Sequence, residues 1–383
     1  MGEVTPPRIS RRALLLSSAA ALGCGRKKAT GFPGYCFVAN RGSRSVTAVD
    51  LNTFRVRKQI PLDAAPSDMA AGPDAEKPKV YALAPNAGTI YEIDVTSLSV
   101  SRRASAGSQA VAMRLSPRGD ALWALYREPA ALVELPLSSF RPARRIPLPS
   151  APESFDLSGD GRAAIASRKG HSVSIVSLSR GAIERTIVSS GEPALVQFRS
   201  DGQLLMAAGP AERSLAIYDV LTGKTVVRLP LPLSPRRFCV SPDGGQLFVT
   251  GDGMDAVAIV FPYSTEIDQT VLAGHAPGAM AVTDTSNSYL LVANPDSNSI
   301  TALDMYTRRL VAVVQVGQAP CEIVLTPDQQ YALTIDEQSG DLAVIRLSAF
   351  SEEWVHHYRS APLFTIVQVG DRPAGAVVVG YRG

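Results

Sequence analysis

The stretch "YLLVANPDSNSITALD", Tyr289 to Asp304, decides the fold because a near copy of it occurs earlier in the chain. The earlier stretch is "YCFVANRGSRSVTAVD", Tyr35 to Asp50, which has the same length and is identical at nine of sixteen positions. The two copies begin 254 residues apart. Self-similarity of this kind is typical of repeat architectures, so the chain has to be searched for a period.

The position of Asp50, near the end of a β-rich run, recurs along the whole chain. Its equivalents follow at steps of 44, 42, 41, 42, 42, 43 and 42 residues, at Asp94, Pro136, Ser177, Asp219, Phe261, Asp304 and Arg346. A proline recurs in the same register, at Pro66, Pro152, Pro193, Pro235, Pro277, Pro320 and Pro373. Ala110 stands in this proline slot in the second unit. Two landmarks in one register indicate eight repeat units.

Each unit contains four short β-rich runs. In the seventh unit they are "YLLVA", "SITALDM", "RLVAVVQV" and "CEIVLT". Runs that are apolar at most positions suit strands that are covered on both faces. Four antiparallel strands in every ~42 residues are typical of a propeller blade. We therefore expect an all-β fold, a closed β-propeller of four-stranded antiparallel blades that occupies residues 34–383 as a single domain.

The two ends of this region should complete one blade together. The region begins with the second strand of a blade, "YCFVAN", and ends with an unpartnered first strand, "AGAVVVG", Ala374 to Gly380. Pairing these strands would remove the exposed edges of the ring. Eight units predict eight blades. Seven blades are the alternative, if the weak third unit, "ALWALYREPAALVEL", or the fourth extends a neighbour.

The repeated motif resembles a known family of propeller repeats. "VAN", "SNSITALD" and "VAVVQVGQAPCEIVLTPD" are similar to the YVTN-type, YncE-like repeat of exported bacterial and archaeal proteins, and the similarity covers residues 34–383. The resemblance implies the propeller fold. It is poor evidence for a particular function, because relatives include binding proteins, surface-layer proteins and propeller domains of redox enzymes.

The N-terminus resembles an export signal. Arg11 and Arg12 precede a short apolar run in "SRRALLL", which is similar to a twin-arginine signal. "ALGC", ending at Cys24, resembles a lipobox, although Ala21 stands where leucine is usual. We expect a signal peptide over residues 1–24, a linker over 25–33, and acylation of Cys24. Cleavage nearby without lipid is the alternative. Either outcome predicts an exported protein, in the periplasm or anchored to the membrane through Cys24.

Composition and motifs offer little support for chemistry. The formal net charge is +3, which gives no reason to expect a nucleic-acid partner. Beyond Cys24 there are three scattered cysteines, with no C-x-x-C pair, and the four histidines are His171, His275, His356 and His357. This inventory speaks against a multi-copper or di-haem centre, and no phosphate-binding loop or nucleophile elbow is present. We expect no cofactor and no metal, and whether the protein is an enzyme stays open, with the balance toward no.

The loops that enter the innermost strands should form one rim of the central channel. The charged residues directly after the proline slot are Asp68, Glu153, Arg236, Arg237 and Glu322. Neighbouring loops add Tyr126, Arg127 and Arg168 to a basic sector beside Arg236. Paired arginines among small residues suit a carboxylate or a phosphate. The alternative is that Arg236 and Arg237 pair with rim acids and are simply solvated.

The last unit carries the one large insertion, between its third and fourth strands. The stretch "SAFSEEWVHHYRSAPLF" brings in Trp354, Tyr358 and Phe364. It could form a contact surface, or equally a plug over the bottom of the channel or over the closure seam. Taken together, the sequence favours a monomeric, non-enzymatic binding scaffold of the cell envelope for a protein or a small anionic ligand. The alternatives are an enzyme, either a lactonase-like hydrolase or a redox propeller, and a structural surface-layer protein.

Overall fold

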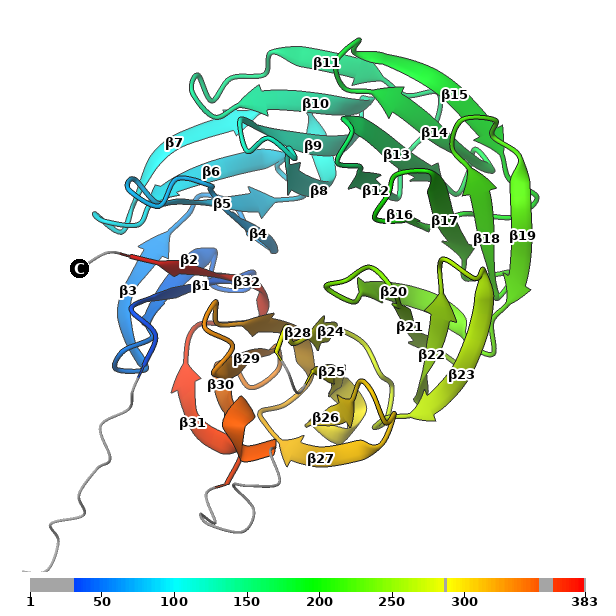
Figure 1. The fold of residues 1–383 in the computed structure, drawn as a ribbon. Coiled ribbons are helices and arrows are strands. Elements are labelled where there is room, and N and C mark those ends of the chain that lie inside the picture. Colours follow the sequence, from blue (N-terminus) through cyan, green and yellow to red (C-terminus); the bar gives the residue numbers. More distant parts are fainter. Residues whose placement is uncertain (1–30, 286–287, 351–360, 382–383) are drawn as a thin grey trace, which may run out of the picture.

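The computed structural model describes residues 31–285, 288–350 and 361–381. Within these residues, eight four-stranded antiparallel sheets stand around a common axis like the blades of a propeller (Figure 1). The expected all-β propeller is confirmed, with eight blades and not seven. Beside the strands there are two short 3₁₀ turns, η1 (Pro295–Ser297) and η2 (Leu347–Phe350). No helix among the described residues is long and apolar enough to cross a membrane.

In each blade the strands are given from the axis outward. Blade 1 contains β32 (Pro373–Gly380), β1 (Gly34–Asn40), β2 (Ser45–Asp50) and β3 (Arg55–Pro61). Blade 2 contains β4 (Asp68–Ala71), β5 (Lys79–Ala84), β6 (Thr89–Asp94) and β7 (Ser99–Ser105). Blade 3 contains β8 (Ser108–Leu115), β9 (Ala121–Glu128), β10 (Ala130–Pro136) and β11 (Arg144–Pro147). Blade 4 contains β12 (Ser154–Leu157), β13 (Arg162–Ser167), β14 (Ser172–Ser177) and β15 (Ala182–Val188).

The remaining blades follow the same order. Blade 5 contains β16 (Leu195–Phe198), β17 (Leu204–Gly209), β18 (Ser214–Asp219) and β19 (Thr225–Pro230). Blade 6 contains β20 (Ser234–Val240), β21 (Leu247–Asp252), β22 (Ala256–Phe261) and β23 (Glu266–Leu272). Blade 7 contains β24 (Met280–Val282), β25 (Tyr289–Asn294), β26 (Ser299–Asp304) and β27 (Leu310–Gln315). Blade 8 contains β28 (Pro320–Leu325), β29 (Tyr331–Asp336), β30 (Asp341–Arg346) and β31 (Leu363–Gln368).

The burial of the strands explains why the blades stack. The two middle strands of a blade are buried on both faces, as β2 is in blade 1, whereas the outer strand β3 is exposed at nearly every residue. Apolar clusters fill the spaces between neighbouring blades, and one of them joins Phe37 of blade 1 to Val80 of blade 2. One sheet alone would leave both of its apolar faces in water, so the ring is the smallest arrangement that covers them all.

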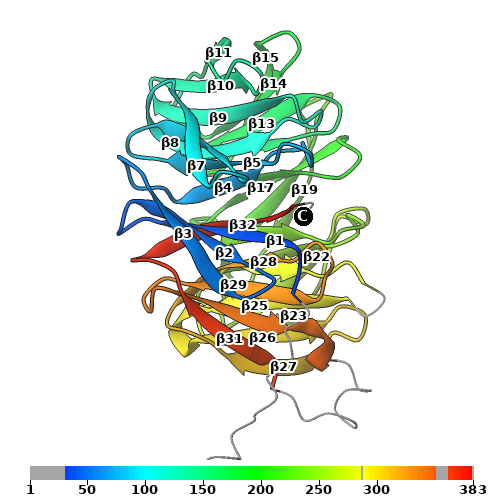
Figure 2. The same cartoon turned by 90° about the vertical axis from the view of Figure 1, so that its left-hand side faces the viewer.

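Blade 1 is built from both ends of the described chain, as the sequence predicts. β1 pairs with β2 on one side and with β32 on the other, both antiparallel. The Tyr381 amide donates to the Pro33 carbonyl at 3.1 Å, and the rings of Tyr35 and Tyr381 lie 4.9 Å apart. Figure 2 shows β32 beside β1 in a view turned by 90°. Pairing of the two ends leaves the ring without an open sheet edge at its seam.

Several predictions fall outside the described residues. The signal peptide over 1–24, Cys24 and most of the linker belong to that part of the chain, as do Trp354 and Tyr358 of the insertion. Phe364 is described, and it lies in strand β31. Its ring packs against those of Phe54 and Tyr331, at 5.3 and 6.0 Å between centroids. This aromatic belongs to the seam between blades 8 and 1 and does not extend a contact surface.

Candidate functional site

Two sets of loops meet on the face where the inner strands begin, here called the rim face. The amide of Gly42, in the loop between β1 and β2, donates to the Asp371 carbonyl in the loop that enters β32. The amide of His275, in the loop that enters β24, likewise donates to the Ser297 hydroxyl at 3.2 Å. The loops assigned to one rim from the sequence therefore lie together in space.

The proline slot marks a ring of residues around the axis. In every blade the second residue after the slot occupies the same place on the inner strand, next to the same position of the neighbouring strand. In blade 2 this pair is Asp68 with Leu83, and in blade 8 it is Glu322 with Ile335. The eight members, called the axis ring below, are Asp68, Ala112, Ser154, Leu195, Arg237, Ala279, Glu322 and Gly375.

A β-bulge separates the two arginines that the sequence presents as a pair. In β20 the register shifts between Pro235 and Arg237, so Arg236 is the extra residue of the bulge. A bulge re-aims the side chain that it inserts. Arg236 forms an ion pair with Asp252 at the end of β21, with about half or more of each side chain exposed. Arg237 takes the place in the axis ring.

The other predicted rim residues are also paired or buried. Arg127 donates to Glu153 at 2.8 Å and to the Pro152 carbonyl at 3.1 Å, which ties blade 3 to blade 4. Arg168 lies 3.8 Å from Glu192. Tyr126 is fully buried, and its hydroxyl donates to the Gly88 carbonyl at 3.1 Å, so this side chain does not contribute to the rim surface.

Two carboxylates of the axis ring are poorly compensated. Protein surrounds Asp68 and Glu322, although each keeps part of its surface open toward the axis. This burial raises the pKa of both groups above the usual range, and the charges of Arg114 and Arg237 offset it only in part. The contacts of these carboxylates are weak. Asp68 accepts from the Met113 amide at 3.4 Å, and Glu322 accepts from the adjacent Ile323 amide at 3.2 Å.

Arg237 is the positive member of the axis ring. Its side chain is exposed, and within the described part of the chain it makes neither a hydrogen bond nor a direct ion pair. Its charge lowers the pKa of Glu322 and of Asp68, so it acts on both carboxylates through space without contacting either. An exposed guanidinium that faces desolvated acids has hydrogen-bonding capacity left for a ligand.

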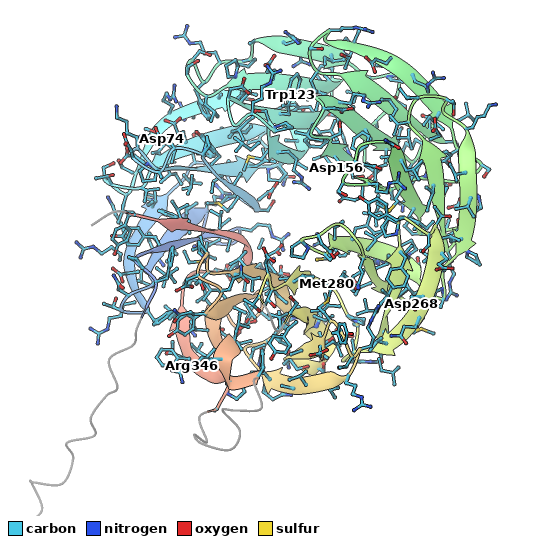
Figure 3. All side chains as sticks on the ribbon, viewed as in Figure 1. Asp74, Trp123, Asp156, Asp268, Met280 and Arg346 are labelled. Carbon is cyan, nitrogen blue, oxygen red and sulfur yellow. The ribbon has the colours of Figure 1, made fainter. Side chains whose placement is uncertain are left out.

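A second level of charged and polar side chains lies two residues further along the inner strands, where sequence reasoning did not look. It consists of Arg114 on β8, Asp156 on β12 and Gln197 on β16. Asp156 accepts from the Phe198 amide at 2.8 Å and from Gln197 at 2.9 Å, and burial raises its pKa. Figure 3 labels Asp156 near the centre of the ring. Alternation along a strand returns every second residue to the same face, so a step of two from the axis ring would have found these residues.

The cysteines of this region are free thiols, and its histidine at position 275 is paired with an acid. Burial, followed by the nearby Glu322, raises the pKa of Cys239 and of Cys321 to about 12, which leaves both thiols protonated and weakly nucleophilic. His275 pairs through Nδ1 with Asp255, an exposed contact that raises the pKa of the imidazole. Among the described residues, no three His, Cys, Asp or Glu side chains are grouped so that they could hold a metal ion.

Beneath the rim, three neighbouring blades carry a polar cluster at the end of their second strand. In blade 7, Asn294 donates to Thr301 at 2.9 Å and accepts from the Gly274 amide at 3.0 Å. Asn40 of blade 1 donates to Thr47 at 2.8 Å in the same way. The approach is so close that a Cβ on Gly274 would lie 2.5 Å from Asn294, which explains why glycine precedes the proline slot here.

Blade 8 has two carboxyl groups in this cluster. Asp336 replaces the asparagine and accepts from the Gly317 amide at 2.9 Å, while Asp341 replaces the serine that the other two blades have. Burial, then the hydrogen bond and the charge of Asp341, raise the pKa of Asp336 to about 8. A protonated Asp336 donates a hydrogen bond, so it does here what the asparagine amide does in blades 1 and 7.

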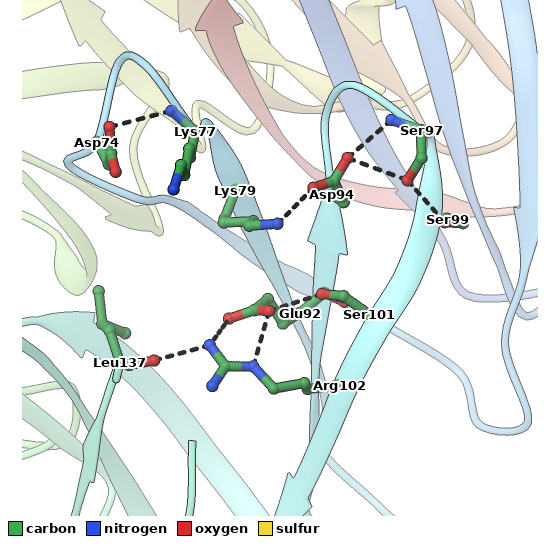
Figure 4. A network of polar contacts seen from close by, with 10 residues as sticks. All are labelled: Asp74, Lys77, Lys79, Glu92, Asp94, Ser97, Ser99, Ser101, Arg102 and Leu137. Carbon is green, nitrogen blue, oxygen red and sulfur yellow. Dashed lines mark hydrogen bonds and ion pairs between the residues drawn. The ribbon is translucent and has the colours of Figure 1, made fainter. Parts of the chain in front are cut away.

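A buried acid of blade 2 shows the opposite behaviour (Figure 4). Glu92 is 2% exposed and accepts from Arg102 at 2.9 Å and from the Ser101 hydroxyl at 2.6 Å. Arg102 also donates to the Leu137 carbonyl of blade 3 at 2.7 Å. Burial alone would raise the pKa of Glu92, but the hydrogen bonds from Arg102 and Ser101 outweigh it, and the pKa is lowered. The protein itself therefore supplies the hydrogen bonds and the positive charge that stabilise the Glu92 carboxylate.

The described surface also has two hollows on the face opposite the rim. One, of about 540 Å³, lies beside Met305 and Tyr306 of blade 7. The other, of about 410 Å³, lies at the seam of the ring, beside Phe32 and Tyr381. Neither hollow is lined by a residue of the axis ring, so the charged group around the axis is a separate feature of the molecule.

Comparisons with known proteins agree on the fold. No family model matches the chain. A stretch of 117 residues is 26% identical to "Seven-bladed beta-propeller protein Rv1057" of Mycobacterium tuberculosis, and it spans 30% of each chain. The match thus covers less than a third of that relative's length. The present structure has eight blades where the relative's name gives seven. The fold and this similarity establish a β-propeller protein.

Several solved structures resemble the chain over most of its length. Dihydro-heme d1 dehydrogenase NirN, in complex with DHE, has a TM-score of 0.74 at 16% identity and covers 91% of this chain and 76% of its own. Kuenenia stuttgartiensis hydrazine synthase has a TM-score of 0.59 at 18% identity and covers 74% and 96%. A functionally unknown protein from Desulfotomaculum acetoxidans has a TM-score of 0.61 at 14% identity and covers 91% and 99%. Likeness at such low identity shows the fold alone.

Proposed function

We propose that this propeller is a non-enzymatic binding protein of the cell envelope, whose ligand docks at the rim-face end of the axis. In this proposal the N-terminal segment directs export and Cys24 anchors the protein to the membrane. The observation that carries the proposal is Arg237, an exposed guanidinium that faces two desolvated carboxylates and contacts neither. The ligand is a small molecule with an anionic group, or an acidic segment of a partner protein.

The contrast between the rim and the axis ring supports this location. At the rim, Arg236, Arg127 and Arg168 each have an acidic neighbour within ion-pair distance. At the axis, the charges act on one another without direct contact. Burying charge without a partner costs free energy, and such sites are found where a ligand supplies the missing contacts. The propeller fold itself fits such a role, because it gathers residues from several blades around one point.

The proposal is tested with protein purified gently from its own cells and weighed by native mass spectrometry. Arg236→Ala is the matched control, because this arginine is adjacent in sequence but paired at the rim. We expect the wild type and Arg236→Ala to carry the same additional mass, and Arg237→Ala to lose it. An added mass that persists in Arg237→Ala would place the ligand elsewhere. The absence of any bound molecule or partner protein in all three would contradict the binding role.

The likeness to hydrazine synthase and NirN, at 18% and 16% identity, brings neither activity to this chain. The hydrolase, redox and surface-layer alternatives therefore rest on fold analogy. The mass experiment also bears on them, because a resident cofactor would give a mass and an absorption spectrum of its own.

A further inference from the structure

The axis ring has a charged half and a neutral half. Going around the axis from blade 6 to blade 2, its members are Arg237, Ala279, Glu322, Gly375 and Asp68. The other half, blades 3 to 5, presents Ala112, Ser154 and Leu195. Each charged side chain of the ring thus has an uncharged residue on either side, and the residues between Arg237, Glu322 and Asp68 are the small Ala279 and Gly375. The result is one positive and two negative groups that face the same space.

From this juxtaposition we propose that the axis ring binds a small zwitterion of the amino-acid class, a molecule that carries one carboxylate and one ammonium group. The inference rests on the proposed function and specifies its ligand. Arg237 of blade 6 receives the carboxylate. Arg114, one level further along the inner strand of blade 3, is a second positive charge that acts mainly on Asp68. Glu322 and Asp68 receive the ammonium group. Ala279 and Gly375, between these side chains, leave room for the body of the ligand.

A ligand that carries only one charge would fit the axis ring less well. A simple carboxylate placed on Arg237 would face the negative charges of Glu322 and Asp68, and the charge of Asp68 already raises the pKa of Glu322. A simple amine placed on the acids would face Arg237 and Arg114, whose charges act on the same carboxylates. Discrimination by an attractive and a repulsive group together is a common source of specificity. A zwitterion satisfies both signs at once.

The release of protons on binding provides an independent test for the ammonium group of the ligand. Burial raises the pKa of Asp68 and Glu322, and an ammonium group beside them would lower it again. Binding in mildly acidic buffer should therefore release protons. The release can be measured by calorimetry in two buffers with different ionisation enthalpies, and a ligand that contacts only Arg237 would not produce it.

The experiment is a calorimetric titration of the full-length protein with ω-amino acids from glycine to 6-aminohexanoate. Each is compared with the carboxylic acid and the amine of the same length, so that charge spacing and charge sign are separated. We expect at least one ω-amino acid to bind about tenfold or more tightly than both of its single-charge counterparts. Arg237→Ala and Glu322→Gln should each weaken it at least tenfold, and Arg236→Ala should leave it unchanged.

Thermal unfolding of each variant shows that a loss of binding is not a loss of fold. Equal binding of the carboxylic acid and the amino acid, with no effect of Glu322→Gln, would overturn the zwitterion and leave an anion site. Failure of every member of the series to bind would overturn the inference as well. The proposed function is decided separately, by whether protein from its own cells carries a mass that depends on Arg237.

Discussion

Glu92 and Glu322 are both surrounded by protein, yet their pKa values move in opposite directions. Glu92, between blades 2 and 3, has Arg102 and Ser101 in direct contact, and its pKa lies below the usual range despite its burial. Glu322, at the axis, has no direct arginine contact among the described residues, and burial raises its pKa. The difference lies in the partners and not in the residue type.

This difference distinguishes acids that stabilise the fold, such as Glu92, from acids that are candidates for ligand binding, such as Glu322. Where the chain itself supplies the partner, a buried acid holds two blades together. Where the chain supplies no partner, the buried acid lowers the stability of the protein. Such an acid is expected at a site where a bound ligand supplies the missing partner. The same comparison extends to Asp336, whose partner in blade 8 is a second acid. The comparison can be tested by changing one of these acids, or one of their partners, at a time.

The largest effect should come from Arg102→Ala. The change leaves Glu92, 2% exposed, without its cation and also removes the contact with the Leu137 carbonyl of blade 3. We expect the free energy of unfolding to fall by about 3 kcal/mol or more, the range for a broken buried pair. Urea denaturation measures it. Lys79→Ala is the control, since its partly exposed pair with Asp94 should cost about 1 kcal/mol or less. Equal losses would mean that burial does not distinguish the two pairs.

Asp336→Asn should remove a pH dependence. The folded pKa of Asp336, about 8, lies above its unfolded value, so its contribution to stability is full below the unfolded pKa and is lost as the pH rises through about 8. Asparagine copies blades 1 and 7 and has no proton to lose. At pH 9 we expect the variant to exceed the wild type by about 2 kcal/mol in free energy of unfolding. The reciprocal variant is Asn294→Asp. The Asn294 amide also donates to the Val292 and Ser299 carbonyls, so a carboxyl group there should have to be protonated and should introduce a pH dependence that blade 7 lacks. A wild type of constant stability from pH 5 to 9 would contradict this.

Glu322→Gln and Asp68→Asn should stabilise the ligand-free protein. Raised pKa values mean that these groups oppose folding more as the pH rises above their unfolded values, so neutral amides should gain up to about 1 kcal/mol at pH 7 and flatten the pH profile. The gain should be nearly absent at pH 3, where both carboxyls are largely protonated in the unfolded chain as well. Thermal unfolding at both pH values measures it. A clear destabilisation at pH 7 would assign both acids to structure.

The smallest effect should come from Arg236→Ala. Its ion pair with Asp252 is solvent-exposed on both sides, so its loss should change the free energy of unfolding by no more than about 0.5 kcal/mol. Urea denaturation in low and high salt measures this, and salt should narrow the difference further. A loss above 1 kcal/mol would show that the rim pairs resemble the Glu92 network more than exposed ion pairs elsewhere.

The sequence predicts the fold in detail because the repeat is local. The period, the proline slot and the β-rich runs can all be read within about 42 residues, and the closure of blade 1 follows from which strand is left over at each end. The same slot locates Asp68, Arg237 and Glu322 around the axis, since it fixes the register of each inner strand.

Other features of the site could not be read from one repeat. The bulge at Arg236 recurs at the equivalent place in β8, β28 and β32. It is a property of how an inner strand pairs with its neighbour, which the residues of one unit do not reveal. The pairing of Arg127 with Glu153 joins two blades, so it depends on the stacking of the ring. Arg114 and Asp156 follow from strand alternation once the axis ring is known, and Tyr126 was misjudged because polar-tipped aromatics also fill cores.

The pairing of β1 with β32 also sets an order in time. Asn40 and Pro373 lie at opposite ends of the described chain, and they meet only when the last blade is in place. At synthesis rates of about 5–20 residues per second, β1 waits tens of seconds for its partner strand. During that interval the growing propeller is an open arc: β1 has an unpaired edge at one end, and the newest blade leaves one of its apolar faces uncovered at the other. A newly made chain of this protein is therefore prone to aggregate in the stage before the ring closes. A chaperone that protects it should bind the open arc and release the closed ring.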